Sequence, residues 1–406
     1  MMKTYTDTAT AVLNKMNWPD KTIESWRRTP IRLLDPMNFK EPVSAESLLT
    51  PSEIPFEETS GLLQFAGTKI LKNEQGTSEG GPAVLSLEEG VRKYPSEKEF
   101  FFPGEWADRF EAWNNSETTH SLFLDLPRGK VLEKPFVLRL DSLSRDHFSA
   151  PRIFVRLGEN WQGSLVIVYS GSEDGQDKEL VNSSLRIWAG QNSHVKIAEI
   201  QTLGLESRLV QNTQILLERD AQVKHSQFQI GAGAIKTNTV FHLKGEGAEL
   251  QAEAIYTSGK NQHKDIRLEQ RHFAPHTTSR ALYKGAVSRR GRSVFQGMII
   301  VEHEAPGTDA YLSNKNLILT KGSRADAIPG LKILVDDVKC SHGSTTGKLD
   351  PAQLFYLMSR GIPKTEAVRI LTEGMFEELI AGHPELPAEW LRDRIARSLE
   401  PGEDLI

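Results

Sequence analysis

The chain has 406 residues, a formal net charge of −5, and 38% hydrophobic against 25% charged residues. Its length allows two or three domains or one large elongated one, and its acidic balance excludes the basic footprint of most nucleic-acid-binding proteins. One cysteine excludes an internal disulfide, and the sequence has neither an apolar signal segment at its N-terminus nor a run of about 18 apolar residues. We therefore expect a cytoplasmic protein that does not span a membrane.

Residues 1–121 are predicted to form a mostly helical N-terminal region. Short helix-favouring segments recur in it, including Trp106–Asn114. Residues 72–83 (KNEQGTSEGGPA) are polar and rich in Gly and Ser, and they predict a flexible loop. We interpret Trp18 and Trp26 as packing residues of a small core, because large aromatic side chains usually anchor cores.

From residue 122 to residue 346 the apolar runs are short and typical of β-strands. Examples are Ile153–Leu157, Leu165–Tyr169, Val195–Ile200 and Val294–Val301. The turns that separate them include Glu159-Asn160, Gly190-Gln191, Asp220-Ala221, Gly247-Ala248, Gly291-Arg292 and Gly322-Ser323. These turns recur about every 30 residues, with one longer gap between Gly247 and Gly291, and a near-constant period indicates a repeat architecture.

Two mainly β architectures fit this pattern, a β-solenoid and a β-sandwich or jelly roll. Sandwiches prefer tight hairpins every 8–12 residues or so. The turns of residues 122–346 are not tight two-residue links. The pattern therefore favours a parallel β-helix as the core of the protein.

Residues 347–406 are predicted to form a C-terminal helical domain. Asp350 can cap a first helix that ends near Arg360, in which Leu354, Leu357 and Met358 fall on one face. Further helices are predicted at Pro363–Glu373, at Met375–Ala381 and at Pro387–Leu399.

Cys340 and His342 lie at the junction between the strand-rich and helical regions. In a strand, residues i and i+2 point to the same face, so thiol and imidazole would be neighbours. Both groups are suitable ligands for iron or zinc, but iron–sulfur proteins usually supply four ligands. A second chain would have to complete such a site; the alternative is a small buried thiol beside a turn histidine.

Other candidate motifs carry less weight. Gly343–Lys348 lacks the spacing of a Walker A motif and is followed by Leu349 rather than Ser or Thr. Asp336 and Asp337 are expected to point to opposite faces of a strand and not to act together. The histidines His225, His242, His263, His272, His276 and His303 show no metal-ligand spacing, and we interpret them as residues of solvated turns.

Five segments together resemble one known family, the B/D scaffold proteins of the SUF iron–sulfur cluster assembly system. They are HFAPHTTSRALYKG (His272–Gly285), SVFQG (Ser293–Gly297), IPGLKI (Ile328–Ile333), DVKCSHG (Asp337–Gly343) and FYLMSRGI (Phe355–Ile362). The resemblance implies a right-handed parallel β-helix flanked by helical regions. It also implies a non-catalytic scaffold subunit that pairs with the SufB subunit and binds the SufC ATPase to support cluster assembly and iron acquisition. The short chain and the single cysteine favour the D-type member.

The same resemblance implies which residues act. His342, with Cys340 beside it, would lie at the heterodimer junction, and His342 is a candidate metal ligand shared with the partner chain. The candidates for ATPase docking are Leu354, Phe355, Tyr356, Arg360, Gly361, Ile362 and Ala367. The isolated chain is expected to form a homodimer at most and to hold no stable cofactor, with iron or an Fe–S cluster bound transiently in the complex.

Two alternatives to this function remain, a carbohydrate-active β-helix enzyme and a homodimeric β-helix binding module. An enzyme of the first kind would cluster acids or bases on one solenoid face, which the sequence does not show. Co-purification separates the three functions, because only the scaffold subunit would bring down both an ATPase and a second β-helix chain.

Overall fold

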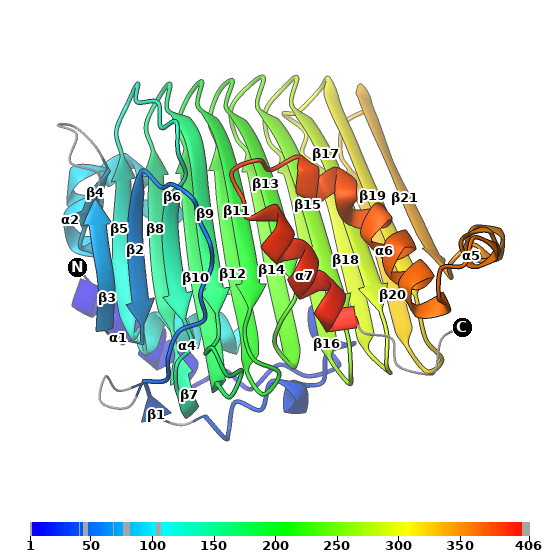
Figure 1. Ribbon diagram of the computed structural model, residues 1–406. Coiled ribbons are helices and arrows are strands. Elements are labelled where there is room, and N and C mark those ends of the chain that lie inside the picture. The colour runs from blue at the N-terminus through cyan, green and yellow to red at the C-terminus, as the bar shows by residue number, and fades with distance from the viewer. Residues whose placement is uncertain are drawn as a thin grey trace.

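Successive strands alternate between two sheets that face each other across an elongated core (Figure 1). The computed structural model describes residues 2–39, 41–43, 48–67, 69–75, 82–102, 106 and 108–399. Even-numbered strands from β8 onward form one sheet and odd-numbered strands from β9 onward form the other, and every pair within these runs is parallel. The predicted parallel β-helix is confirmed, with about eight turns.

The first sheet consists of β4 (Ala83–Leu85), β5 (His120–Leu126), β8 (Pro151–Leu157), β10 (Lys178–Ala189), β12 (Arg208–Leu217), β14 (Ala234–Leu243), β16 (His263–His272), β18 (Arg292–Val301) and β20 (Arg324–Ile333), with β1 (Glu41–Pro42) and β7 (Arg145–Ser149) beside it. The second consists of β2 (Gly61–Ala66), β3 (Lys69–Gln75), β6 (Phe136–Asp141), β9 (Gln162–Ser170), β11 (His194–Thr202), β13 (Gln222–Gln229), β15 (Glu249–Ser258), β17 (Thr278–Val287), β19 (Thr308–Ile318) and β21 (Val338–Gly347). We call them the even sheet and the odd sheet.

The space between the two sheets is filled by every second residue of each strand, as the period-two geometry of strands requires. Leu165 and Ile197 are typical of the odd sheet, and Ile215 and Phe241 of the even sheet; all four are completely buried. Equivalent positions of successive coils stack in register, so each coil buries its apolar face on the next. We call this enclosed space the lumen.

One corner of each coil has a residue in the left-handed backbone conformation. The residues are Asn160, Asn192, Asp220, Gly247, His276 and Gly307. Backbone bonds link these corners, and the side chain of Asn192 donates to Asn160 Oδ1 at 2.6 Å. Asn, Asp and Gly tolerate this conformation best, so this corner produces the period seen in the sequence. Gly291 belongs to the other corner, which explains the longer gap after Gly247.

The N-terminal region contains both helices and strands. Its helices are α1 (Met2–Leu13), η1 (Glu24–Trp26), η2 (Ile31–Leu33), α2 (Leu87–Lys93), η3 (Pro95–Glu97), α3 (Lys98–Phe101) and α4 (Arg109–Ser116). The prediction of a mostly helical region missed the antiparallel pair β2–β3, which extends the odd sheet, and β4, which pairs with β5. Residues 72–75 of the predicted loop belong to β3, and residues 76–81 lie outside the described residues. Trp26 is buried and stacks on Phe110, as predicted for a core residue.

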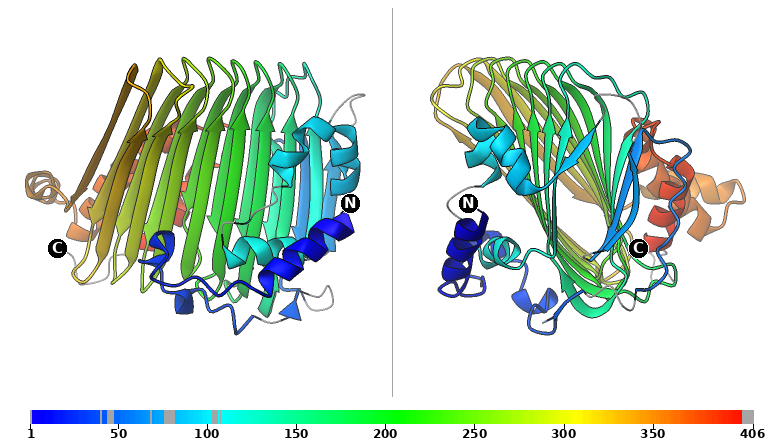
Figure 2. Two further views of the ribbon diagram at one scale, coloured as in Figure 1. Left: turned by 180° about the vertical axis from the view of Figure 1, so that it is seen from behind. Right: turned by 90° about the vertical axis from the view of Figure 1, so that its left-hand side faces the viewer.

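The C-terminal helices are α5 (Pro351–Ser359), α6 (Lys364–Ala381) and α7 (Ala388–Leu399). The expected pair Pro363–Glu373 and Met375–Ala381 is one helix, α6. Figure 2 shows that α6 and α7 lie on the outer face of the odd sheet, opposite the N-terminal helices. Phe376, Leu391 and Ile395 are buried there against strand residues such as Phe228 and Ile255. These two helices are therefore packed on the solenoid; residues 400–406 of the predicted domain lie outside the described residues.

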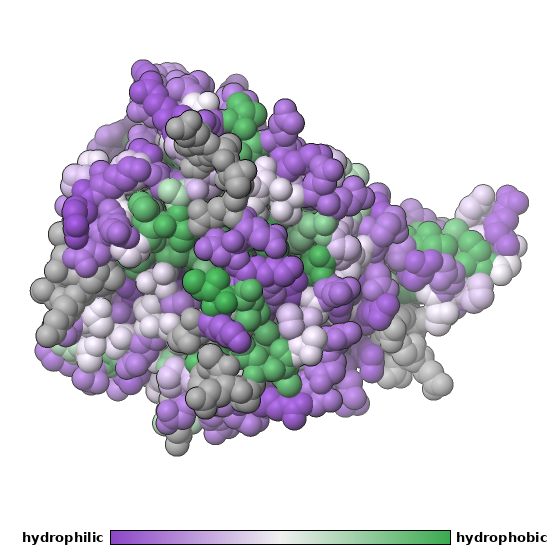
Figure 3. All heavy atoms as spheres, turned by 60° about the vertical axis from the view of Figure 1, so that its left-hand side comes forward, coloured by the Kyte–Doolittle hydropathy of each residue, from purple (hydrophilic) through white to green (hydrophobic). Residues whose placement is uncertain are grey.

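Helix α5 differs from α6 and α7 because it projects beyond the last coil (Figure 1). Its predicted apolar face is only partly covered: Leu354 packs against the apolar cluster of α6 and α7, but within α5, all of which the structure describes, no side chain is fully buried. In Figure 3 this projecting helix, at the right, shows hydrophobic surface. Among the helices of the described chain, none is long and apolar enough to cross a membrane.

Candidate functional site at the open end of the solenoid

The last coil, formed by β20 and β21, leaves the solenoid open. Each of these strands pairs on one side only, β20 with β18 and β21 with β19, and no other described strand covers the outer edge of either. Their outward N–H and C=O groups form a template for pairing with another strand. The opposite end of the odd sheet is closed by β3, an antiparallel edge strand that carries Lys69 and Lys72, and charged edge residues of this kind discourage pairing.

The apolar core of the lumen is exposed at this end. Leu331 and Ile333 of β20 continue the columns of Ile299 and Val301, which are completely buried one coil earlier. In the last coil their exposed fractions rise to 38% and 37%. Adjacent exposed apolar side chains beside an unpaired strand edge are typical of a protein–protein contact surface. The apolar run Leu331–Val335 and the IPGLKI string pointed to a strand here, but not to its exposure at an open end.

Cys340 and His342 lie side by side on the lumen face of β21. Cys340 is in register with Ala310, and His342 is in register with Leu312; both partners are buried in the core. The prediction that thiol and imidazole share one strand face is therefore confirmed. Cys340 is half-buried against the core, whereas His342 is exposed at the mouth of the lumen.

The environment of Cys340 disfavours the thiolate. Burial raises the pKa of the Cys340 thiol; the backbone of Ala310 acts in the opposite direction, and the charge of Asp309 raises the pKa further. Since the thiolate is the form that binds metals and attacks sulfur, Cys340 is the less reactive of the two groups. His342 is the better candidate for a ligand.

A buried polar chain supports β21 from inside the lumen. Tyr256 donates to Asn316 Oδ1 at 2.7 Å, and Asn314 Nδ2 donates to Tyr256 Oη at 2.7 Å. Asn316 Nδ2 lies 2.6 Å from Asn314 Oδ1 and 3.4 Å from Thr346 Oγ1. This polar chain thus reaches Thr346 in β21, four residues beyond His342. Our reading of the sequence missed it, although the alternation Asn314-Lys315-Asn316 in a strand marks two amides on one face.

The predicted docking residues fall into two groups. Phe355 and Tyr356 of α5 are 72% and 57% exposed, and the Arg360 guanidinium lies 5.3 Å from the centre of the Tyr356 ring. Gly361 follows with a positive φ of 86°, which a side chain would disfavour. Leu354 and Ile362 are partly buried. Ala367, in contrast, is completely buried in α6, so it positions that helix and does not face a partner.

Two interpretations of the sequence were wrong. His225, His242, His263 and His272 lie in strands and not in solvated turns, whereas His276 and His303 do lie in exposed turns. His225 is completely buried, and its Nε2 lies 2.5 Å from Glu199 Oε1 in the lumen. Asp336 and Asp337 belong to the turn between β20 and β21, not to a strand. Among the described residues, no three His, Cys, Asp or Glu side chains are arranged so that they could hold a metal ion.

Comparison with known proteins agrees with this architecture. Residues 139–375 match a family described as "SUF system FeS cluster assembly, SufBD core domain". The chain is 26% identical to the iron–sulfur cluster assembly protein SufD of Escherichia coli, over 89% of this chain and 84% of that protein. It is 26% identical to SufB of Bacillus subtilis over 72% of this chain and 64% of that protein. A SufBD family protein of Mycobacterium leprae, ML0594, is 36% identical over 46% of this chain and 48% of that protein, which is about half of each.

The family match covers more than half of the chain and includes all coils from β9 to β21. It ends within α6, after the open last coil and the projecting helix α5. The chain is a member of the SufBD family and has a role in iron–sulfur cluster assembly by the SUF system.

Proposed function

We propose that this chain is a D-type, non-catalytic scaffold subunit, which pairs with a SufB-like β-helix subunit through the open last coil. The observation that carries the proposal is the pair of uncovered edges of β20 and β21 beside the exposed Leu331 and Ile333. A second β-helix with a similar open end could add its strands to both sheets and bury the exposed core. In the absence of that partner, the same edges would pair with a second copy of this chain.

The junction formed in this way would contain the assembly site. Neutral imidazole is a good ligand for iron, and His342 is exposed at the mouth of the lumen, where a partner's thiolates can approach. Cys340 would line the junction as a thiol. An Fe–S cluster or iron ion would be the transient cargo of this shared site. The chain alone would hold no stable cluster, because one imidazole and one half-buried thiol leave half of the usual four ligand positions unfilled.

Helix α5 is proposed as the dock for a SufC-like ATPase. Phe355 and Tyr356 offer aromatic side chains to a partner's groove, and such helix-in-groove contacts are a common mode of recognition. Helix α5 contacts α6, which is packed on the odd sheet. ATP hydrolysis would take place in that partner, in the cytoplasm.

Co-expression with a SufB-like chain and a SufC-like ATPase tests this function. Size-exclusion chromatography with light scattering should find all three in one complex, and anaerobic purification should give iron and sulfide in the complex but not in the isolated chain. Elution of this chain apart from both partners would contradict the proposal. Hydrolysis of a polysaccharide by the isolated chain would instead favour a carbohydrate-active enzyme.

A further inference from the structure

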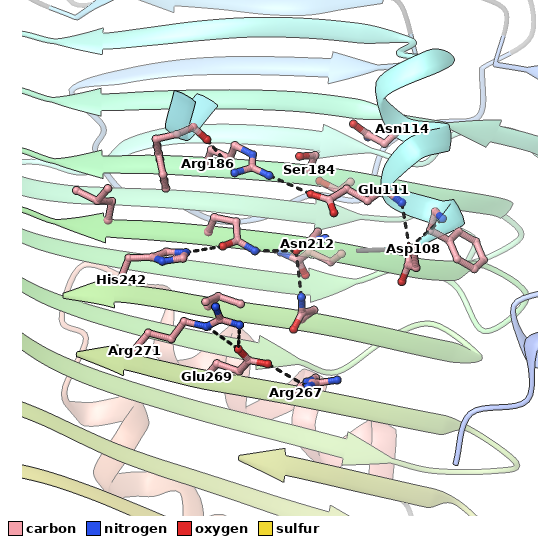
Figure 4. Close-up of a pocket in the computed structure, with 18 of the residues that line it drawn as sticks. Asp108, Glu111, Asn114, Ser184, Arg186, Asn212, His242, Arg267, Glu269 and Arg271 are labelled. Atoms are coloured by element: carbon pink, nitrogen blue, oxygen red, sulfur yellow. Dashed lines mark hydrogen bonds and ion pairs between the residues drawn. The ribbon is translucent and has the colours of Figure 1, made fainter. Parts of the chain in front are cut away.

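A cleft of about 720 Å³ lies on the outer face of the even sheet, where the N-terminal region crosses strands β10 to β16 (Figure 4). Its floor is formed by outward side chains of these strands, and one wall is formed by α3 and α4. This volume is in the range of small-molecule sites, which occur preferentially between separately packed parts of a protein. The cleft lies two strands from β20, and its lining includes no residue of β20, β21 or α5, so the proposed function does not use it.

Three cations line the β16 side of the cleft, with Arg271 and Lys244 together at one end and Arg267 beside Asn238, nearer the middle. Arg267 and Arg271 both bind the carboxylate of Glu269, with distances of 3.0 Å and 2.5 Å between nitrogen and oxygen. One carboxylate neutralises one of these two charges, and both guanidiniums keep N–H donors without a partner in the described structure. Lys244 Nζ lies 3.3 Å from the centre of the Phe273 ring and has no ion-pair partner among the described residues.

The imidazole of His242 lies beside these positive charges. Burial lowers the pKa of His242, and the charges of Arg271, Lys244 and Arg186 lower it further, to about 3. His242 is therefore neutral at physiological pH and adds no charge. Its Nε2 lies 2.7 Å from Gln214 Oε1, which fixes the ring.

A row of amides connects this cationic end with the middle of the cleft. Asn212 Oδ1 accepts hydrogen bonds from Gln214 Nε2 at 3.2 Å and from Asn238 Nδ2 at 3.3 Å. Asn238 Oδ1 is buried and has no hydrogen-bond partner among the described groups. A buried acceptor without a partner costs about 1–3 kcal/mol, so a ligand that donates an N–H or O–H here would be favoured.

We propose that this cleft binds a small organic phosphate that carries hydroxyl groups. The phosphate would lie between Lys244 and Arg271, because a guanidinium group binds phosphate with two parallel hydrogen bonds. A hydroxyl of the ligand would donate to Asn238 Oδ1. Sugar phosphates and nucleotides share this chemistry, and both fit the volume of the cleft.

Isothermal titration of the full chain with ribose 5-phosphate and with adenosine monophosphate tests the proposal. Ribose and inorganic phosphate serve as comparators. At least one of the two phosphorylated ligands should bind with a dissociation constant below about 1 mM. Tighter binding of one of these two ligands would show whether the cleft takes a sugar phosphate or a nucleotide. Arg271→Gln should weaken binding about tenfold or more, whereas Arg280→Gln should not, since Arg280 forms a similar exposed ion pair with Asp309 on the odd sheet.

Lys244→Gln provides a second variant, which removes a charge without breaking an ion pair and should also weaken binding. Asn238→Leu should weaken the binding of the organic phosphate but leave the binding of inorganic phosphate unaffected. Three results would each overturn the proposal: no binding of either phosphorylated ligand, equal binding of inorganic phosphate, or binding unaffected by Lys244→Gln and Arg271→Gln.

Discussion

Asn316 in β19 and Thr346 in β21 lie side by side in register on adjacent strands of the odd sheet, with 3.4 Å between Asn316 Nδ2 and Thr346 Oγ1. This contact is the outermost step of the polar chain that runs from Tyr256 through Asn314. Strand β21 has only one neighbouring strand, so this chain supplies part of what holds it in place. The position of His342 therefore depends on side chains buried deeper in the solenoid.

Replacement of Asn316 by Leu should lower the free energy of unfolding by about 1–3 kcal/mol, because Tyr256, Asn314 and Thr346 each lose a hydrogen-bond partner. Urea unfolding measures this change. Thr345→Val is the matched control, since Thr345 lies on the exposed outer face of β21. Equal stability of the Asn316→Leu variant and the unaltered chain would show that the polar chain does not support β21.

His342→Ala should sharply reduce the iron and sulfide content of complexes purified anaerobically with the partner chains. The exposed imidazole contributes little to packing, so the free energy of unfolding should change by less than about 0.5 kcal/mol. Cys340→Ala should have the smaller effect on cluster content, because burial raises the pKa of that thiol. Undiminished cluster content in the His342→Ala complex would exclude this imidazole as a ligand.

The double variant Phe355→Ser/Tyr356→Ser should abolish binding of the ATPase while leaving the β-helix partner bound. Removal of residues 348–406 would be a poor test, because α6 and α7 bury apolar side chains on the odd sheet. Leu205→Ser is a suitable control, since Leu205 is 57% exposed in a distant turn. Pull-down with each separate partner measures both interactions. ATPase binding that survives the double variant would place the dock elsewhere.

His383 joins the α6–α7 connection to the odd sheet. It is buried, with Nε2 2.6 Å from Ser226 Oγ of β13 and Nδ1 2.9 Å from Glu385 Oε1. Burial lowers the pKa of His383, but the carboxylate of Glu253 in β15, 3.7 Å from Nε2, and the hydrogen bond with Glu385 outweigh burial and the charge of Lys224, so the pKa lies above its ordinary value. Burial raises the pKa of Glu253 and of Glu385. The interaction with His383 is the strongest of the contacts that oppose burial, and together these contacts lower both pKa values below the usual 4.5.

These shifts predict a pH window for the attachment of α6 and α7. A raised imidazole pKa stabilises the fold fully below the ordinary value of 6.5, and this contribution is lost as the pH rises through the higher folded value. The carboxylate contributions are lost as the pH falls below 4.5. Stability should therefore decrease from about pH 6 to about pH 9, and His383→Gln should remove most of this decrease. Urea unfolding of the unaltered chain and of His383→Gln at both pH values measures this difference. An equal loss of stability in the two proteins would contradict the account.

The solenoid could be predicted from the sequence because its period is repeated in every coil. Left-handed corners at Asn192, Asp220 and Gly247 need residues that tolerate that conformation, and these residues mark the period in the sequence. The shared face of Cys340 and His342 was also predictable, since residues two positions apart in a strand point to the same side.

Features that depend on contacts between distant segments were not predictable. Strand β2 pairs with β6 of the odd sheet, and β3 pairs with β2. The sequence of these two strands does not show which sheet they extend. The apolar faces of α5 and α6 look alike in sequence, yet only α6 is buried. The sequence pattern shows only that His225 is polar. Its burial is explained by Glu199, which lies on the neighbouring strand β11 and pairs with it inside the lumen.

Hydrogen–deuterium exchange of the backbone amides in β20 and β21, with and without a SufB-like partner, tests the central claim most directly. In the free chain the outward amides of these strands have no strand partner in the described structure and should exchange rapidly. In the complex they should become protected, while amides of central strands such as β12 and β13 should not change. Protection confined to other surfaces, with β20 and β21 still exchanging rapidly, would contradict pairing through the open end of the solenoid.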